Sequence, residues 1–341
     1  MSPGETEVAD RSDQPVAVGV HGPDPIEPSK DPAVAVSGVW PSVQVREVGY
    51  FRPMQTQETN ATSAGTWTLG DLTINRIGFG AKRLMGDPGR VIGVLRRAIE
   101  LGVNHIDTAA FYPTYANAEQ AIHDFTPLHW ANEIINQALA PYPDDLVIVT
   151  KVGPASDGLA RPEELRGQVE ENLRQLGRDF LDVVNLRQHG LDSIAERFGA
   201  LSELRDAGLI RHLGISNVRP QHLAQAQEIA PVVCVQNRYG VDFGRVNDET
   251  LRTCGEQGVA FVPFFAITGT GREAGGVADN DPVLAIARAH GATPAQVRIA
   301  WTLSRGLHVL AIPGTGNPDH LAENVAAGAL RLTADELSSL E

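Results

Sequence analysis

The chain of 341 residues is 42% hydrophobic and 21% charged, a composition typical of a globular protein with a substantial core. Its net charge of -14 argues against a nucleic-acid or acidic-membrane surface, and no apolar run approaches the roughly 18 residues of a membrane span. Cys234 and Cys254 are too few for a disulfide framework, and the start of the chain shows no signal or transit pattern, so we expect a cytoplasmic protein.

The first part of the chain differs in composition from the rest. Residues 1–64 are rich in Pro, Ser, Asp, Glu and Thr without a sustained period, and we expect a disordered extension. Met54 stands near the end of this stretch, so an upstream start codon is an alternative explanation for what precedes it. After it, W-T-L, Gly70-Asp71 and L-T-I predict a short hairpin that opens a domain over residues 65–341.

Beyond the hairpin, short apolar runs alternate with amphipathic stretches. Nearly continuous apolar runs are expected of strands buried on both faces of a parallel sheet. The eight predicted strands are Ile77–Gly80, Val103–Asp107, Val147–Lys151, Leu181–Leu186, His212–Ile215, Val232–Gln236, Val259–Phe264 and Val309–Ile312. Helices are predicted around 88–101, 130–140, 161–176, 191–207, 219–229, 246–257, 281–290, 294–304 and 318–327. Eight strand–helix units favour a (β/α)8 TIM barrel, and an open doubly wound sheet is the alternative because periodicity does not report closure.

Two of these strands end in groups that can transfer protons. Asp107 ends one strand and Lys151 another, and Tyr112 follows the first of them in the loop. A nearby ammonium lowers the pKa of a phenol, so the three residues are suited to protonating a carbonyl oxygen through Tyr112. The alternative is a buried Asp–Lys pair that joins two strands, with Tyr112 packed at the rim.

Polar residues also end the next strands along the chain. Ser216 and Asn217 close the strand H-L-G-I, and Gln236 closes V-V-C-V. Neighbouring Ser, Asn and Gln side chains suit a carboxamide ligand, although Ser216 or Asn217, taken alone, is better explained as the cap of the helix that follows.

A glycine-rich turn, I-P-G-T-G-N-P, precedes the last predicted helix. Free backbone N–H groups and the positive end of a helix dipole form an anion site at such a turn. The alternative is an ordinary turn in which Asn317 caps the helix and Pro318 occupies its first turn.

Two further patterns carry less weight. The segment Gly269–Ala274 matches G-x-G-x-x-A, but two more glycines and no suitably placed acid follow it, so we interpret it as a flexible loop or lid. His123 and His129 have no close third ligand, and we expect no metal site.

Taken together, the motifs resemble the aldo-keto reductase family over about residues 66–340. The matching motifs, in the family's order, are the hairpin, G-F-G, H-I-D-T-A-A-F-Y, T-K-V-G, G-I-S-N, V-Q-N and I-P-G-T followed by E-N. The resemblance implies a barrel that binds an extended nicotinamide dinucleotide and transfers hydride to an aldehyde or ketone. The segment D-V-V-N-L-R resembles the sequences of a bacterial subgroup that includes pyridoxal reductases.

The resemblance also assigns roles by position. Tyr112 is implied to donate the proton, Lys151 to lower its pKa, and Asp107 to pair with Lys151. The implied cofactor residues are Gly80, Ser216, Asn217, Gln236, Phe264 or Phe265 as the stacking aromatic, and Gly314, Thr315, Gly316, His320, Glu323 and Asn324 around the adenosine and its phosphate.

The chain departs from the family's pattern at two places. Arg187 stands where the family usually has a catalytic histidine, and we expect it, rather than His189, in the pocket, where it can orient a carbonyl but cannot shuttle a proton. Gly314 and His320 replace the cations that often hold the 2'-phosphate. NADPH is the expected cofactor, with NADH not excluded.

We therefore expect a reversible NAD(P)H-dependent reductase of small carbonyl compounds, either pyridoxal-like or secondary-metabolite and sugar carbonyls. The alternative is a nucleotide-binding regulatory or redox-sensing subunit with little turnover on the same scaffold. The stretch from Thr114 to Trp130 is lengthened relative to the subgroup, in a loop that normally lines the substrate mouth. The sequence indicates no oligomeric state.

Overall fold

The computed structural model describes residues 59–115, 127–243, 245–267 and 280–341. Residues 1–58 of the expected extension, the glycine-rich segment Gly269–Ala274 and most of the lengthened loop lie outside the described residues. Structure begins slightly earlier than expected, because Ala61–Ala64 form a 3-10 turn (η1) with both alanines buried.

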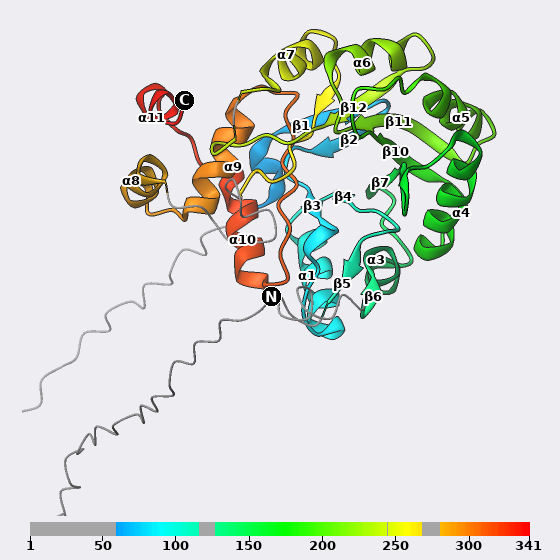
Figure 1. Ribbon diagram of the computed structural model, residues 1–341. Coiled ribbons are helices and arrows are strands. Elements are labelled where there is room, and N and C mark those ends of the chain that lie inside the picture. The colour runs from blue at the N-terminus through cyan, green and yellow to red at the C-terminus, as the bar shows by residue number, and fades with distance from the viewer. Residues whose placement is uncertain (1–58, 116–126, 244, 268–279) are drawn as a thin grey trace, which may run out of the picture. The chain divides into compact units, whose positions relative to one another are not determined.

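Seven parallel strands form one sheet in which spatial order follows chain order (Figure 1). They are β3 (Phe79–Gly80), β4 (His105–Asp107), β7 (Val147–Val152), β10 (Leu181–Arg187), β11 (Ile210–Ser216), β12 (Val232–Gln236) and β13 (Ala260–Phe261). Each neighbouring pair is parallel, which requires a crossover between consecutive strands.

The two edges of this sheet are joined by the predicted eighth strand. Val309 bridges to Phe261 on one side and Ala311 bridges to Ile77 on the other, both in parallel register. The backbone N–H of Leu310 donates to the carbonyl of Phe261 at 2.9 Å. This segment therefore closes the sheet, and the TIM-barrel expectation is confirmed over the open-sheet alternative.

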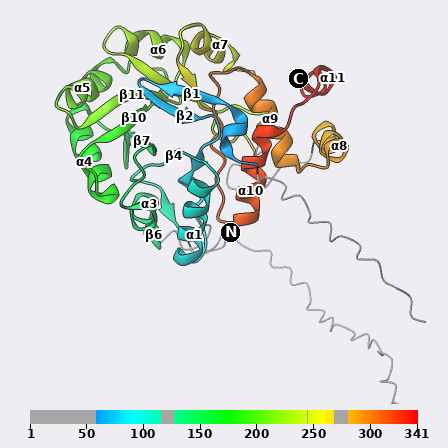
Figure 2. The same cartoon turned by 180° about the vertical axis from the view of Figure 1, so that it is seen from behind.

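Helices surround the strands, as Figures 1 and 2 show from opposite sides. They are α1 (Pro88–Glu100), α3 (Ala131–Leu139), α4 (Leu165–Leu176), α5 (Ala195–Asp206), α6 (Pro220–Gln227), α7 (Asp248–Glu256), α8 (Asp281–His290), α9 (Pro294–Ser304), α10 (Pro318–Ala326) and α11 (Ala334–Ser339). All but α11 were predicted. That six-residue helix has no buried residue, so no apolar period marks it in the sequence. Among the described residues, no helix is long and apolar enough to cross a membrane.

The hairpin of β1 (Thr66–Leu69) and β2 (Leu72–Asn75) fills the amino-terminal end of the barrel. Its Leu69 and Ile74 are fully buried among inward-facing strand residues such as Val183. One end of the barrel is therefore packed with apolar side chains, and a site for a ligand is left to the carboxyl ends of the strands.

Candidate active site

A buried ion pair occupies the carboxyl ends of β4 and β7. The Lys151 ammonium donates to both carboxylate oxygens of Asp107, at 2.7 and 2.8 Å, and to the carbonyl of Thr108 at 3.0 Å. Lys151 is only 1% exposed. Burial lowers the pKa of Lys151, but Asp107 and then Tyr112 raise it by more, so the net shift is upward and the ammonium keeps its charge.

Tyr112 lies beside this pair. Its ring centre is 5.0 Å from Lys151 Nζ, and the residue is 6% exposed. Burial raises the pKa of Tyr112 by more than Lys151 lowers it, so the phenol holds its proton above its ordinary range. The lowering influence of Lys151 was predicted from the sequence, whereas the larger opposite influence of burial was not.

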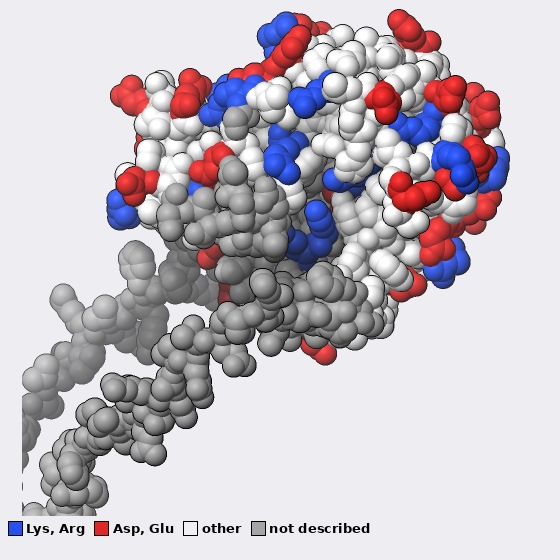
Figure 3. All heavy atoms as spheres, viewed as in Figure 1, with Lys and Arg blue, Asp and Glu red and all other residues white. Residues whose placement is uncertain are grey.

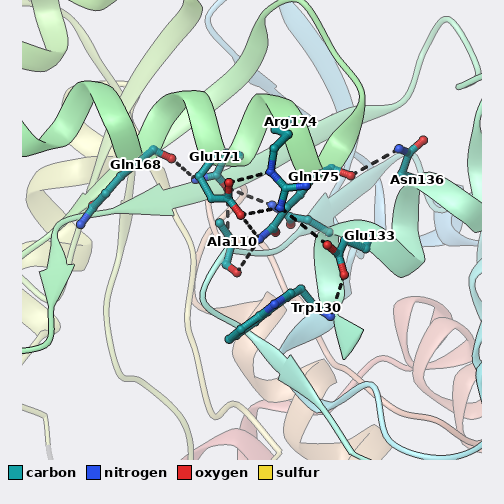
Figure 4. A network of polar contacts seen from close by, with 10 residues as sticks. Ala110, Trp130, Glu133, Asn136, Gln168, Glu171, Arg174 and Gln175 are labelled. Atoms are coloured by element: carbon teal, nitrogen blue, oxygen red, sulfur yellow. Dashed lines mark hydrogen bonds and ion pairs between the residues drawn. The ribbon is translucent and has the colours of Figure 1, made fainter. Parts of the chain in front are cut away.

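The loop that carries the phenol is fastened to α4 by a surface network (Figure 4). The side-chain amide of Gln175 donates to the carbonyl of Ala110 at 3.3 Å and to Glu171 at 2.8 Å. Arg174 joins Glu171 at 2.7 Å and approaches Glu133 of α3 at 3.7 Å. These contacts connect the loop after β4 to two helices and limit its movement.

A second network of hydrogen bonds, which is buried, contacts the same loop. The Asn172 side-chain oxygen accepts from the backbone N–H of Ala110 at 3.1 Å, from Asn132 at 3.0 Å and from the Thr150 hydroxyl at 2.5 Å. Thr108 in turn donates to Asn132 at 2.7 Å. Asn172 therefore ties the start of the loop to the strand that carries Lys151, which fixes the geometry between the phenol and the ammonium.

The site opens into a hollow at this end of the barrel. Tyr112, Asp107 and Arg187 all line it, together with backbone from the ends of the first and eighth strands. The structure thus places Arg187 in the pocket, as expected, whereas His189 is not among the described lining residues. Figure 3 shows basic side chains gathered around a hollow in the face it views.

An aromatic pair forms one wall of the hollow. Phe264 and Phe265 meet edge to face with ring centres 5.2 Å apart. Phe265 has a φ of 66°, in the left-handed region that non-glycine residues rarely adopt, so the fold holds this residue in a strained conformation at the pocket. Both candidates for the stacking aromatic therefore reach the site.

The residues expected to hold a carboxamide lie at the ends of adjacent strands, and some of their side-chain atoms are already hydrogen-bonded while others are not. Ser216 Oγ and Gln236 Oε1 are buried and have no hydrogen-bond partner among the described residues. In contrast, Gln236 Nε2 donates to Asp107 at 2.7 Å, and the Asn217 amide donates to the carbonyl of Gln188 at 2.7 Å. One donor-acceptor atom and one acceptor are thus unpaired, and of the two residues Gln236 lines the hollow.

The glycines at the ends of the first and eighth strands have a packing role. A Cβ on Gly314 would collide with the carbonyl of Gly80, and one on Gly80 would lie 2.5 Å from the carbonyl of Ile312. These glycines are required for close approach of the two backbones, whether or not a phosphate binds beside them.

At the start of α10, Asn317 and Pro318 of the glycine-rich turn form the ordinary helix cap that was the alternative to an anion site. Asn317 caps the helix by accepting from the backbone N–H of Asp319 at 3.0 Å, and Pro318 is the first helical residue. The Thr315 hydroxyl accepts from the backbone N–H of Asn317 at 3.0 Å. His320 is exposed on the first turn.

The remaining expected cofactor residues lie on or near this helix. Gly316 packs so closely on the carbonyl of Met85 that a side chain would collide with it. Glu323 is half-buried and Asn324 is buried on α10. None of these residues lines the hollow at Tyr112.

Sequence reasoning missed two basic residues that line the hollow, Lys82 and Arg83. They lie in a 3-10 turn, η2 (Ala81–Arg83), directly after β3. Their position just beyond a predicted strand end was the available signal, because loops at that end of a barrel form the site.

The chain is similar to known proteins along most of its length. The model of the aldo/keto reductase family matches residues 76–341. Pyridoxine 4-dehydrogenase of Escherichia coli is 41% identical over 301 residues, which cover 82% of this chain and 98% of that protein. An uncharacterized oxidoreductase of Schizosaccharomyces pombe, C215.11c, is 31% identical over 300 residues, which cover 83% and 90%. An aldo-keto reductase from Klebsiella pneumoniae, solved in complex with NADPH, has a TM-score of 0.65 and 26% identity, covering 79% of this chain and 90% of that one.

Proposed function

Since the chain belongs to the aldo/keto reductase family, we propose that it is an NADPH-dependent oxidoreductase that reduces an aldehyde or ketone to an alcohol, with Tyr112 as the proton donor. The observation that carries this proposal is the buried contact of Lys151 with Asp107 beside the Tyr112 phenol, at the floor of an open hollow.

The residues present fit a nicotinamide dinucleotide. The unpaired Ser216 Oγ and Gln236 Oε1 would hold the carboxamide, and Phe264 or Phe265 would cover the ring. The backbone around Gly314, at the end of the closing strand, would lie along the phosphates. When bound, the reduced nicotinamide supplies the hydride. The NADPH complex of the Klebsiella relative supports NADPH as the cofactor.

Each residue at the floor has a separate task in this proposal. Tyr112 gives its phenolic proton to the carbonyl oxygen as the carbonyl carbon becomes saturated. Lys151, held charged by Asp107, stabilises the phenolate that remains. Arg187 donates to the same oxygen, orients the carbonyl and stabilises its developing negative charge. Alcohol oxidation uses the same groups in reverse.

The pyridoxine 4-dehydrogenase relative supports an aromatic aldehyde such as pyridoxal as the first substrate to test. We also propose that the protein works in the cytoplasm, since its two cysteines, Cys234 and Cys254, are both buried and unpaired. Fractionation of cells that express the protein tests this placement.

The central test compares native protein with Tyr112→Phe in NADPH oxidation with a panel of aldehydes. We expect kcat to fall by about 10²–10⁴-fold, because the proton donor is removed. NADPH affinity, measured by fluorescence titration, should not change, and NADH should bind more weakly than NADPH. Tyr142→Phe is the matched control, since its hydroxyl donates to the carbonyl of Leu176 outside the pocket.

The outcome decides between catalysis and regulation. If native protein binds NADPH but reduces no aldehyde, and Tyr112→Phe behaves identically, the reductase proposal fails and a cofactor-binding regulatory subunit explains the fold. If Tyr142→Phe loses as much turnover as Tyr112→Phe, the role of Tyr112 as proton donor is refuted.

A further inference from the structure

Four basic side chains lie over the two rings of the aromatic wall: Lys82, Arg83 and Arg238 over Phe265, and Arg187 over Phe264. Lys82 Nζ lies 5.0 Å from the ring centre of Phe265, and the Arg187 guanidinium carbon lies 5.9 Å from that of Phe264. Both side chains line the same hollow, Lys82 from η2 after the first strand and Arg187 from the end of β10.

No acid balances these two cations within the described part of the chain. Neither Lys82 nor Arg187 forms an ion pair there, and Asp107, the only acid among the described lining residues, already binds Lys151 and Gln236. Partial desolvation, and then the charges of Arg187 and of the chain neighbour Arg83, lower the pKa of Lys82, although its side chain is otherwise exposed. Two cations that repel each other across a hollow favour an anion between them.

The order of the strands indicates which molecule brings that anion. Lys82 follows the first strand, Tyr112 follows the second and Arg187 ends the fourth. The residues proposed for the nicotinamide amide, Ser216 and Gln236, end the fifth and sixth. In strand order Lys82 and Arg187 thus lie on either side of Tyr112, where the carbonyl compound has to bind, and Lys82 also adjoins the closing strand proposed for the phosphates.

We propose, on the premise of the reductase function above, that the substrate carries a carboxylate or phosphate near its carbonyl group and that Lys82 selects for this anion. Arg187 is shared between the anion and the carbonyl oxygen, since its planar fork presents several donors. Lys82 contributes a single charged donor from the opposite side and is the specificity-determining residue.

The test uses pairs of carbonyl compounds that differ mainly in charge. Butanal is paired with 4-oxobutanoate and benzaldehyde with 4-carboxybenzaldehyde for carboxylates, and pyridoxal with pyridoxal 5'-phosphate for phosphate. In native protein we expect a higher kcat/KM for the anionic member of at least one pair. Lys82→Met should lower the ratio of anionic to neutral kcat/KM by about tenfold, the size of one charge-assisted hydrogen bond.

Arg90→Met is the matched control, because it removes an exposed cation from the start of α1, outside the hollow, and changes the net charge equally. It should leave the ratio unchanged. If Lys82→Met lowers NADPH affinity and depresses all substrates alike, Lys82 serves the cofactor and the proposal is wrong. Equal kcat/KM for both members of every pair also overturns it, while the reductase function stands.

The anion site can also be tested by measuring the binding of unreactive ligands, which does not depend on catalytic activity. Calorimetry with the NADP⁺-bound protein compares succinamate with butanamide, which share an unreactive carbonyl and differ by a carboxylate. We expect succinamate to bind more tightly, with the advantage lost in Lys82→Met. If no aldehyde is reduced but this difference is found, the reductase proposal fails and the anion site stands. No difference overturns the site.

Discussion

The two ends of the barrel both bury a charged side chain, but they satisfy it differently. At the amino-terminal end, Arg76 donates to the carbonyls of Leu303 and Gly306, each at 2.6 Å, and to those of Val309 and Ala64. At the carboxyl end, the carboxylate–ammonium pair lies beneath an open hollow, and polar atoms on neighbouring strands have no partner among the described residues.

The charged side chain at the amino-terminal end serves stability, whereas the pair at the carboxyl end also serves the chemistry of the site. The donors of Arg76 bind backbone carbonyls of the closing strand, of η1, and of α9 and the turn after it, so this charge holds the closing strand to the surrounding elements. Lys151 and Asp107 also hold two strands together, but they face a phenol, a guanidinium and a cavity. Substitutions at the two ends should therefore affect different measurements.

The largest effect is expected from Lys151→Met. This change leaves Asp107 buried without its cation, which should cost about 3–5 kcal/mol of the free energy of unfolding, measured with urea. It also removes the group that stabilises the phenolate, so kcat should fall by at least about 10²-fold. Both the folding and the chemistry of the carboxyl end depend on this ammonium.

A double variant separates the two contributions. Asp107→Asn combined with Lys151→Met removes the uncompensated charge and should recover part of the lost stability, but none of the turnover. Equal stability of the single and double variants would contradict a charge-pair origin. Recovered turnover in the double variant would contradict the catalytic assignment.

A smaller effect, confined to stability, is expected from Arg76→Met. The variant removes the Arg76 donors from four backbone carbonyls, of which only that of Gly306 is shown to keep another donor, the N–H of Val309, so the free energy of unfolding should fall by about 2–4 kcal/mol. Since Arg76 lies at the end of the barrel away from the hollow, kcat/KM well below the melting temperature should match that of native protein. A loss of kcat/KM without a loss of stability would mean that the two ends are coupled.

The same comparison explains what the sequence could predict. Asp107 and Lys151 were identifiable because each ends a nearly continuous apolar run, and the carboxyl ends of parallel strands meet at one end of a barrel. The eighth strand was predicted from its apolar run, although it pairs only through single bridges. Patterns that extend over several residues thus specified the fold and the floor of the site.

Contacts between residues far apart in the chain could not be predicted from the sequence. Gln236 was assigned to a ligand, yet its amide nitrogen binds Asp107, 129 positions away. Lys82 sits in a short 3-10 turn with no period, so its direction into the hollow depends on how the first and eighth strands meet. The net upward shift in the pKa of Tyr112 likewise depends on burial, which only the assembled barrel supplies.

The smallest effect concerns the exposed ion pair that ties the hairpin to the amino-terminal end of β11. Arg211 and then His212 hold the pKa of Asp71 well below its usual range, each through a 2.6 Å contact. The folded state therefore favours the carboxylate, and this stabilisation is complete above the ordinary value of 3.8 and is lost as pH falls through the lowered pKa. Exposed pairs of this kind contribute little, so Asp71→Asn should lower the melting temperature by about a degree.

The pH dependence of this change in melting temperature identifies its physical source. The gap in melting temperature between native protein and Asp71→Asn should be level above about pH 5 and close progressively below it, because the unfolded chain binds the proton near the ordinary pKa and folded Asp71 binds it only at lower pH. It should also shrink in high salt, since an exposed pair is screened. A gap that persists to the lowest pH at which the protein folds would instead assign the effect to packing of the hairpin. A fall in kcat/KM would show that the closed end of the barrel reaches the chemistry at the open one.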